Sequence, residues 1–252
     1  MSEIKAFLAE LGGVTRLTWE AFFAFWRRPI EVRPLIHQLD IAGLQSWSIT
    51  MLTAIFTGMV LALQFATGLE PYGASMYTGK LSSLGIVREL GPMLTALLVG
   101  GRVGSGIAAE LGSMVVTEQV DAIRALGADP VKKLVVPRVF ACIVMLPLLT
   151  MLANLVGICG SLIITVREVG VTAKFFYAQI LDTLGVVDLM HGLMKSIAFG
   201  YIIGIVGCYV GLKTSGGTEG VGAATTRAVV VGAIGLLVSN FFLTKFFLAL
   251  YG

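Results

Sequence analysis

The run from Trp47 to Leu69 carries no charged side chain, and this constrains the fold more than any other feature of the chain. A helix needs about 20 apolar residues to cross the hydrocarbon core of a bilayer. The composition agrees, because 56% of the residues are hydrophobic and 13% are charged. A soluble domain is about 25% charged. The sequence therefore excludes an ordinary soluble enzyme, a disordered chain and a nucleic-acid-binding protein.

Four further apolar stretches are long enough to span a membrane. Pro147 lies inside the third of the five spans and predicts a kink, because proline removes a helical hydrogen bond. The sequence therefore predicts an all-α integral membrane protein with five transmembrane helices. The four further spans are expected from about Leu84 or Leu90 to Val116, Val135 to Val166, Leu193 to Leu212 and Ala228 to Tyr251.

The beginning of the chain differs from the rest. Apolar residues recur at helical spacing up to Val14, with charged residues between them. The aromatic stretch that follows ends at Arg27 and Arg28, and aromatic rings beside cations suit the headgroup layer. We expect residues 1–45 to form an interfacial amphipathic helix and an elbow helix, and residues 46–252 to form the five-span domain. A short soluble helix is the alternative for the amphipathic part.

Lysine and arginine residues are distributed unevenly between the two ends of the expected spans. Positively charged loops face the cytoplasm. We therefore expect a cytoplasmic N-terminus and a periplasmic C-terminus. The first residues fit neither a signal peptide, because Glu3, Lys5 and Glu10 interrupt the apolar run, nor a transit peptide, so we expect a bacterial inner-membrane protein. The eleven cations expected on the cytoplasmic side are Lys5, Arg16, Arg27, Arg28, Arg33, Arg124, Lys132, Lys133, Arg138, Lys213 and Arg227, and the six on the other side are Lys80, Arg88, Arg167, Lys174, Lys195 and Lys245.

A polar segment separates the second span from the third. We expect a short helix from Thr117, which can cap its start, to Gly127, which suits its end. Asp129 followed by Pro130 suits the start of the next helix. A short, rigid, charged helix is what docking into a partner's groove requires, and a solvated connector is the alternative. The charged side chains expected on its surface are Glu118, Asp121 and Arg124.

Three ionisable residues, Arg88, Glu89 and Lys195, lie where the second and fourth spans are expected to begin. Ionisable groups at such depth are costly and are normally paired or face water. They fit the rim of an outward-open cavity that meets a lipid phosphate, and snorkelling at helix ends is the alternative. Arg102, deeper in the second span, is expected to satisfy carbonyl groups or a carboxylate inside the bundle.

Small residues recur four apart on the second and fourth spans, which permits close contact between helices. Packing within the chain is the default interpretation, and a contact between two copies of the chain is the alternative. The small residues are Gly100, Gly104, Ala108 and Gly112 on the second span, and Gly200, Gly204, Gly207 and Gly211 on the fourth.

The motifs of this chain, in their order and spacing, closely resemble the MlaE (YrbE) family. These proteins are permeases of ABC transporters that move phospholipid in Gram-negative envelopes. The resemblance covers about residues 45–250. It is carried by Arg88-Glu89-Leu90-Gly91-Pro92, Gly101-Arg102-Val103-Gly104-Ser105, Ala109-Glu110-Leu111-Gly112, Thr117-Glu118-Gln119, Asp129-Pro130, Pro137-Arg138, Pro147-Leu148-Leu149-Thr150 and Ala224-Thr225-Thr226-Arg227.

The resemblance implies two functional sites. The polar helix becomes a coupling helix that inserts into a separate cytoplasmic ATPase and transmits ATP-driven motion. A lipid site combines apolar walls from the first span with the charged rim described above. The coupling residues are Thr117, Glu118, Gln119, Asp121 and Arg124, and the substrate-binding residues are Leu61, Gln64, Leu69, Tyr72, Arg88, Glu89 and Lys195.

The resemblance also implies an assembly. Two copies of the chain would form the permease core, above two MlaF-like ABC ATPase subunits. A small MlaB-like STAS-domain protein would bind the ATPase, and a hexameric ring of MlaD-like MCE-domain subunits would lie on the periplasmic side. ATP and magnesium would bind the ATPase, so no cofactor is expected on this chain.

Hydrolysis of ATP by the chain itself is not expected. The segment from Gly73 to Lys80 has the wrong spacing for a phosphate-binding loop, and Leu81 stands where a hydroxyl residue would hold magnesium. The rival function is a self-contained channel or secondary carrier for a hydrophobic solute. Such a protein would show an ionisable relay or broken helices at the midplane, and only Arg102 approaches the core of the expected spans.

Overall fold

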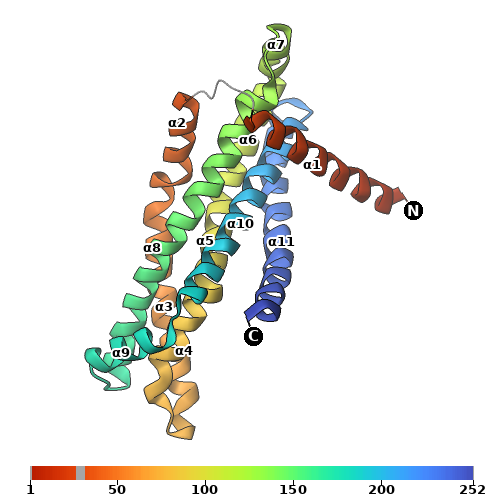
Figure 1. The fold of residues 1–252 in the computed structure, drawn as a ribbon. Helices are drawn as coiled ribbons and strands as arrows, with labels where there is room; N and C mark the ends of the chain where they lie inside the picture. Colours follow the sequence, from red (N-terminus) through yellow and green to blue (C-terminus); the bar gives the residue numbers. More distant parts are fainter. Residues whose placement is uncertain (1, 27–31, 252) are drawn as a thin grey trace.

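The computed structural model describes residues 2–26 and 32–251, and within these ranges the secondary structure is helical, without strands. Five helical stretches are long and apolar enough to cross a membrane (Figure 1). The prediction of an all-α membrane protein is thereby confirmed. Arg27 and Arg28 lie outside the described residues. The five stretches are Val32–Tyr72, Ser75–Val116, Val131–Glu168, Val186–Leu212 and Gly217–Leu250.

Several of the long stretches combine shorter elements, which Figure 1 labels where there is room. The elements are α1 (Ser2–Trp26), α2 (Val32–Ala42), the 3-10 turn η1 (Leu44–Ser46), α3 (Trp47–Leu69), the 3-10 turns η2 (Glu70–Tyr72) and η3 (Ser75–Tyr77), α4 (Thr78–Gly85), the π-helical turn η4 (Ile86–Leu90), α5 (Gly91–Val99), the π-helical turn η5 (Gly100–Gly104), α6 (Ser105–Val116), α7 (Gln119–Ala125), the π-helical turn η6 (Val131–Val135), α8 (Val136–Glu168), α9 (Ala173–Thr183), α10 (Val186–Leu212) and α11 (Gly217–Tyr251).

The residues expected to form an elbow continue directly into the first span. Helix α2 packs against α8 and leads through Gly43 and η1 into α3. Arg102 fixes this junction from the second span, because its guanidinium donates to Ser46 Oγ at 2.8 Å and to Gln45 Oε1 at 2.9 Å. It also lies 3.5 Å from the carbonyl oxygen of Ile41. Arg102 therefore has a structural role, as the sequence predicted.

The second span begins much earlier than its apolar run. Residues 78–83 include the hydroxyl residues Thr78, Ser82 and Ser83 and the charged Lys80, yet they belong to α4. Their hydroxyl groups donate to carbonyl oxygens one turn back, as Ser82 does to Thr78 and Ser83 does to Gly79, each at 2.7 Å. Ser82 also bonds Ser161 of α8 at 2.6 Å. These polar side chains are thus satisfied inside the bundle, and the helix extends by about three turns.

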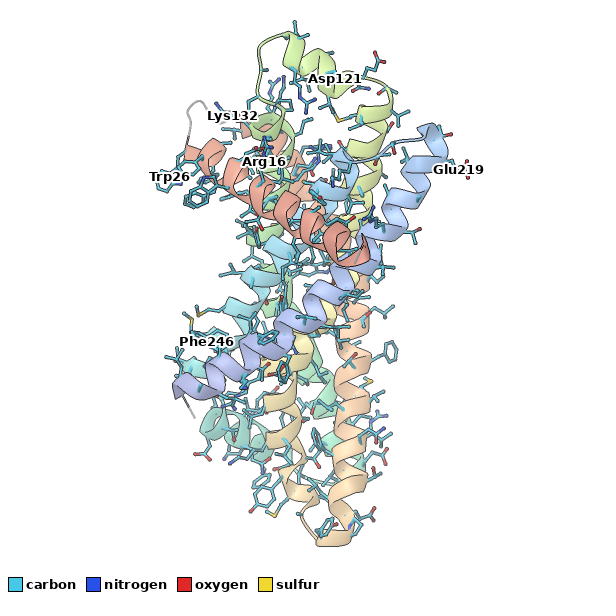
Figure 2. All side chains as sticks on the ribbon, turned by 90° about the vertical axis from the view of Figure 1, so that its right-hand side faces the viewer. Arg16, Trp26, Asp121, Lys132, Glu219 and Phe246 are labelled. Carbon is cyan, nitrogen blue, oxygen red and sulfur yellow. The ribbon has the colours of Figure 1, made fainter. Side chains whose placement is uncertain are left out.

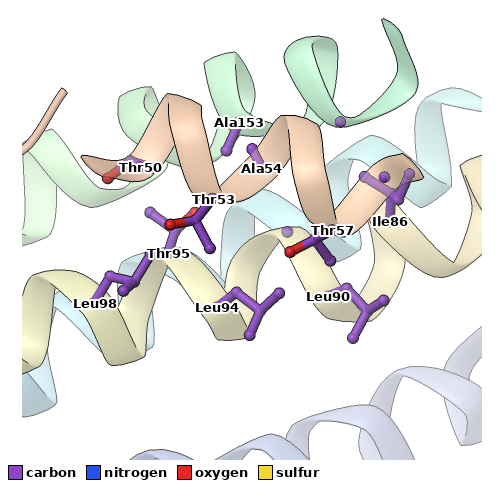
Figure 3. Close-up of a pocket in the computed structure, with 13 residues that line it drawn as sticks. Thr50, Thr53, Ala54, Thr57, Ile86, Leu90, Leu94, Thr95, Leu98 and Ala153 are labelled. Atoms are coloured by element: carbon purple, nitrogen blue, oxygen red, sulfur yellow. The ribbon is translucent and has the colours of Figure 1, made fainter. Parts of the chain in front are cut away.

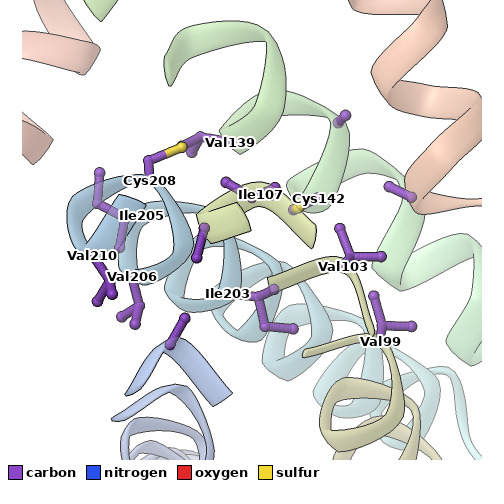
Figure 4. Close-up of a cluster of buried hydrophobic side chains, with 14 of the residues drawn as sticks. Val99, Val103, Ile107, Val139, Cys142, Ile203, Ile205, Val206, Cys208 and Val210 are labelled. Atoms are coloured by element: carbon purple, nitrogen blue, oxygen red, sulfur yellow. The ribbon is translucent and has the colours of Figure 1, made fainter. Parts of the chain in front are cut away.

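The hydrophobic core lies between α6, α8 and α10 (Figure 4). The small residues of the second and fourth spans form part of this contact. A Cβ atom at Gly200 would lie 2.4 Å from the carbonyl oxygen of Cys142, and one at Gly207 would lie 2.9 Å from that of Gly104. Gly211 likewise approaches Ala108. The stripes therefore pack within the chain.

Helix α1 runs across the direction of the bundle at one end (Figure 1). It is tied to the spans by an ion pair between Glu10 and Arg227 and by a hydrogen bond between the hydroxyl groups of Thr18 and Tyr201. Its aromatic side chains remain exposed, with Trp19 at 65% and Trp26 at 73% (Figure 2). The location of α1 in the membrane interface stays a prediction.

A further short helix, α9, was not expected from the sequence. Thr172 caps it by accepting a hydrogen bond from the Phe175 amide at 3.3 Å. Phe176 is fully buried against Gly79 of α4, and Gln179 donates to the Met76 carbonyl oxygen at 2.9 Å. Helix α9 thus covers the start of the second span, at the end of the bundle opposite α7 (Figure 1).

Candidate functional site

A proline in the second span creates the local geometry of the charged site. Pro92 has no N–H, so the carbonyl oxygen of Arg88 lacks its usual helical donor. The Gly91 amide bonds the Ile86 carbonyl oxygen five residues back, which makes η4 a π-helical turn. Lys195 of α10 supplies the missing donor, with its Nζ atom 3.1 Å from the Arg88 oxygen. The carbonyl oxygen that Pro92 leaves without a helical donor is thus bonded by a buried ammonium group.

Lys195 is paired as well as buried. Its side chain is 2% exposed, and its Nζ atom lies 2.6 Å from Glu89 Oε1. It also donates to Thr244 Oγ1 of α11 at 2.8 Å. Asn240, one turn earlier on α11, donates to Glu89 Oε2 at 3.3 Å. Side chains from two helices, α10 and α11, therefore contact the Glu89 carboxylate, which carries the charge that balances Lys195.

A second ion pair lies beside the first. Arg88 donates through Nε and Nη2 to Asp188 Oδ1, each at 2.5 Å. Asp188 also accepts from the Gly185 amide at 2.9 Å, which closes the first turn of α10. Asp188 is 6% exposed and Arg88 is 43% exposed. The pair thus joins a buried carboxylate to a guanidinium that reaches the surface of the site.

Arg88, Glu89 and Lys195 border one open cavity of about 260 Å³, which we call the ion-pair cavity, whereas Asp188 pairs with Arg88 without lining it. His191 lies one turn before Lys195 on α10 and stacks on Phe247 of α11, with ring centroids 4.7 Å apart. The cavity therefore has a charged floor and apolar walls. It is lined by Leu84, Gly85, Arg88, Glu89, His191, Lys195, Thr244, Phe247 and Leu248.

A more apolar cavity of about 530 Å³ lies on the other side of η4, along α3. Leu61 and Gln64 line it together with Leu90. A narrow, threonine-lined pocket between α3 and α5 adjoins it, and Thr53, Thr57 and Leu90 border both (Figure 3). Because a Cβ atom at Gly85 would lie 3.5 Å from Leu61 Cδ2, the apolar and charged regions are close neighbours.

The structure corrects part of the sequence-based site. Arg88, Glu89 and Lys195 do not begin their helices, because the second span starts at Ser75 and α10 starts at Val186. Leu69 and Tyr72 border neither of the two cavities, and Tyr72 is 83% exposed at the end of the first span. The structure thus brings Arg88, Glu89 and Lys195 together and places Leu61 and Gln64 nearby.

The sequence analysis did not assign to the site four polar residues that line the ion-pair cavity or contact its charged side chains, namely Asp188, His191, Asn240 and Thr244. Asp188 and His191 precede Lys195 by seven and four residues, so all three share one face of α10. Asn240 and Thr244 share a face of α11 in the same way. The spacing of polar residues within apolar spans was the signal that could have revealed these two groups.

The polar helix between the second and third spans is α7, at one end of the bundle (Figure 1). Thr117 does not cap it, because its hydroxyl donates to the Ser113 oxygen at the end of α6. Glu118 occupies the N-cap position instead, in the left-handed conformation with φ 59°. Gly127, at φ 75°, ends the helix as expected. The Asp129 side chain accepts from the Val131 amide at 2.9 Å and caps the next helix.

Helix α7 presents a charged face and is anchored by one apolar side chain. Glu118, Gln119, Asp121 and Arg124 are exposed, whereas Val120 is only 4% exposed. Asp121 and Arg124 pair at 2.8 Å on the surface. Leu126, at the C-terminal end, is 86% exposed. A short helix with this face can dock into another protein, since its backbone is fixed and its side chains are free to contact a partner.

Comparison with known proteins assigns the chain to a family. The family model described as "Permease MlaE" matches residues 35–246. A probable ABC transporter permease protein of Synechocystis is 43% identical over 90% of this chain and 87% of its own length. A probable ABC transporter permease protein of Rickettsia felis is 38% identical, over 96% and 93%. The protein TRIGALACTOSYLDIACYLGLYCEROL 1, chloroplastic, of Arabidopsis thaliana is 37% identical, over 86% and 62%.

The family model covers α7, the second, third and fourth spans, and all but the outermost residues of the first and fifth spans. The chain therefore belongs to the MlaE family of ABC transporter permeases.

Proposed function

We propose that this permease moves phospholipid, or a similar lipid, between the bacterial inner membrane and a periplasmic carrier. A partner ATPase drives the movement. The observation that carries the proposal is the junction of two unlike cavities, one with a charged floor and one with apolar walls. An amphiphile needs both environments, because its head group is charged and its acyl chains are apolar. The name of the plant relative, which contains that of a glycerolipid, supports the same substrate class.

In this proposal α7 is the coupling helix. The ATPase, with ATP and magnesium bound, receives the exposed face of α7 and shifts it. Because α6 joins α7 to η5, and Arg102 of η5 holds the start of α3, that shift reaches the wall of the apolar cavity. The end of the bundle that carries α7 faces the cytoplasm, as the excess of lysine and arginine indicates.

The assembly we propose is a homodimer with two MlaF-like ATPase subunits, an MlaB-like STAS-domain protein and a hexamer of MlaD-like MCE-domain subunits in the periplasm. Large apolar side chains on α3 and α11 are exposed and form surfaces that a second copy of the chain or lipid can cover. The glycine stripes do not supply this contact, because they pack within the chain. The C-terminus lies on the periplasmic side in this arrangement.

Reconstitution tests the transport proposal. The chain and its ATPase are placed in liposomes with a labelled phospholipid, and transfer to an acceptor protein is followed with and without ATP. We expect transfer that requires both ATP and the ATPase. Transfer at an equal rate without the ATPase, driven by a proton gradient, would support a self-contained carrier and contradict the proposal.

A change in α7 tests coupling separately. The double variant Glu118→Asn and Asp121→Asn removes two exposed carboxylates, and asparagine tolerates the left-handed conformation at position 118. We expect ATPase binding to weaken about thirtyfold or more, because losing charged contacts across an interface costs about 2–5 kcal/mol. Co-purification of the ATPase and lipid-stimulated ATP hydrolysis are the measurements.

Asp182→Asn is the matched control, because Asp182 is an exposed acid on α9 at the opposite end of the bundle. It should leave ATPase binding unchanged. Normal stimulation in the α7 double variant would show that these carboxylates do not couple the two subunits.

A further inference from the structure

Three charged side chains, Arg88, Glu89 and Lys195, line the ion-pair cavity, and Asp188, which pairs with Arg88, makes the formal charges of the site cancel. Arg88 and Lys195 are the cations, and Glu89 and Asp188 are the anions. A site built only to capture an anion would keep a net positive charge. This balance means that a phosphate entering the cavity meets a carboxylate as well as a guanidinium. A ligand that is complementary to these charged side chains carries one positive and one negative group.

In each ion pair, one side chain is buried and the other is partly exposed. The side chains of Asp188 and Lys195 are 6% and 2% exposed, whereas those of Arg88 and Glu89 are 43% and 38% exposed. The exposed members are one cation and one anion, next to each other on η4, and both line the same cavity. The buried members hold them in place from α10. The cavity thus presents a fixed positive group beside a fixed negative group.

Hydrogen bonding also leaves capacity on both exposed groups. Arg88 pairs with Asp188 through Nε and Nη2, and Nη1 takes no part in that pair. Glu89 Oε1 accepts from Lys195 at 2.6 Å, whereas Oε2 has only the longer contacts of 3.3 Å with Asn240 and Thr244. Arg88 can therefore donate to a phosphate, and Glu89 Oε2 can accept from a primary ammonium group.

We propose that the ion-pair cavity selects phospholipids with a zwitterionic head group, holding the phosphate at Arg88 and the ammonium at Glu89. This inference rests on the proposed lipid transport and adds the class of head group. Phosphatidylethanolamine satisfies both exposed charges. Phosphatidylglycerol carries the phosphate without the ammonium, so its negative charge faces Glu89 without compensation.

Competition between two lipids tests the selectivity. The full-length chain is reconstituted with equal amounts of phosphatidylethanolamine and phosphatidylglycerol of identical acyl chains, and the lipids retained after mild detergent extraction are counted by native mass spectrometry. We expect the wild type to retain phosphatidylethanolamine over phosphatidylglycerol by about tenfold, the effect of one well-placed charged contact. Because this measurement uses the wild-type protein, its outcome does not depend on whether a variant folds.

Glu89→Gln keeps a hydrogen-bond acceptor for Lys195 but removes the negative charge. This variant should retain more phosphatidylglycerol than the wild type does, so the ratio of the two retained lipids should fall to about one. Asp182→Asn, which removes a carboxylate outside the cavity, should keep the wild-type preference. Equal retention of the two lipids by the wild type would overturn the proposed selectivity.

A blocked cavity separates failure of this inference from failure of the proposed function. Leu248 lines the ion-pair cavity and is 57% exposed, so Leu248→Trp narrows the opening without touching the ion pairs. Loss of both lipids in this variant, together with equal retention in the wild type, would keep a lipid site but reject the selectivity. Undiminished retention of both lipids in Leu248→Trp would show that the lipid lies elsewhere and overturn both proposals.

Discussion

Replacing Gly58 with alanine should destabilise the protein by about 3 kcal/mol or more, because α3 and α8 touch there backbone to backbone. A Cβ atom at Gly58 would lie 1.9 Å from the carbonyl oxygen of Gly157, and one at Gly160 would lie 2.3 Å from that of Ile55. Backbone atoms of two packed helices cannot move aside as a flexible side chain can. The whole contact must open, which we expect to see as a lower melting temperature and a smaller monodisperse fraction in detergent.

Gly68→Ala is the matched control on the same helix. A Cβ atom at Gly68 has no neighbouring atom within 4 Å. The substitution should therefore be neutral or stabilising by up to about 1 kcal/mol, since alanine favours a helix over glycine. If both variants melted at the wild-type temperature, close approach of α3 to α8 would not contribute to stability.

The membrane spans could be predicted from the sequence because their signal is local. An uncharged run such as 47–69 needs no knowledge of its neighbours to be recognised. The start of the second span could not be found in this way. Residues 78–83 are polar, and they become helical because their hydroxyl groups bond the backbone and, through Ser82, helix α8. That bond depends on packing between distant segments.

The charged site shows the same limit. Arg88, Glu89 and Lys195 stood out in the sequence because charges are rare inside apolar spans. Their partners did not, since Lys195 and Glu89 are 106 residues apart and Thr244 is a further 49 residues from Lys195. Besides the spacing of polar residues on α10 and α11, Pro92 carries a local signal, because a missing amide frees the oxygen that Lys195 contacts. The sequence pattern thus identified the three residues, the family resemblance implied a lipid site at them, and the structure added which of them pair.

The buried ion pair allows a second prediction with a large expected effect. Glu89→Ala should destabilise the protein by about 3–5 kcal/mol, because it leaves the Lys195 ammonium buried without its counter-charge. Lys195→Met should cost less, about 1 kcal/mol, since Glu89 is 38% exposed and can turn to the water of the open cavity. Equilibrium unfolding of the purified variants in mixed micelles gives both free energies.

The double variant separates the ion pair from the shape of the site. Glu89→Ala combined with Lys195→Met removes both charges, so most of the loss seen in Glu89→Ala should be recovered. Additive losses in the double variant would mean that Lys195 is held by Thr244 and the Arg88 oxygen alone. The double variant also lacks the Glu89 carboxylate that we assign to head-group recognition. It should therefore fold stably and still retain less phosphatidylethanolamine than the wild type. A pair kept for folding alone would leave lipid retention unchanged.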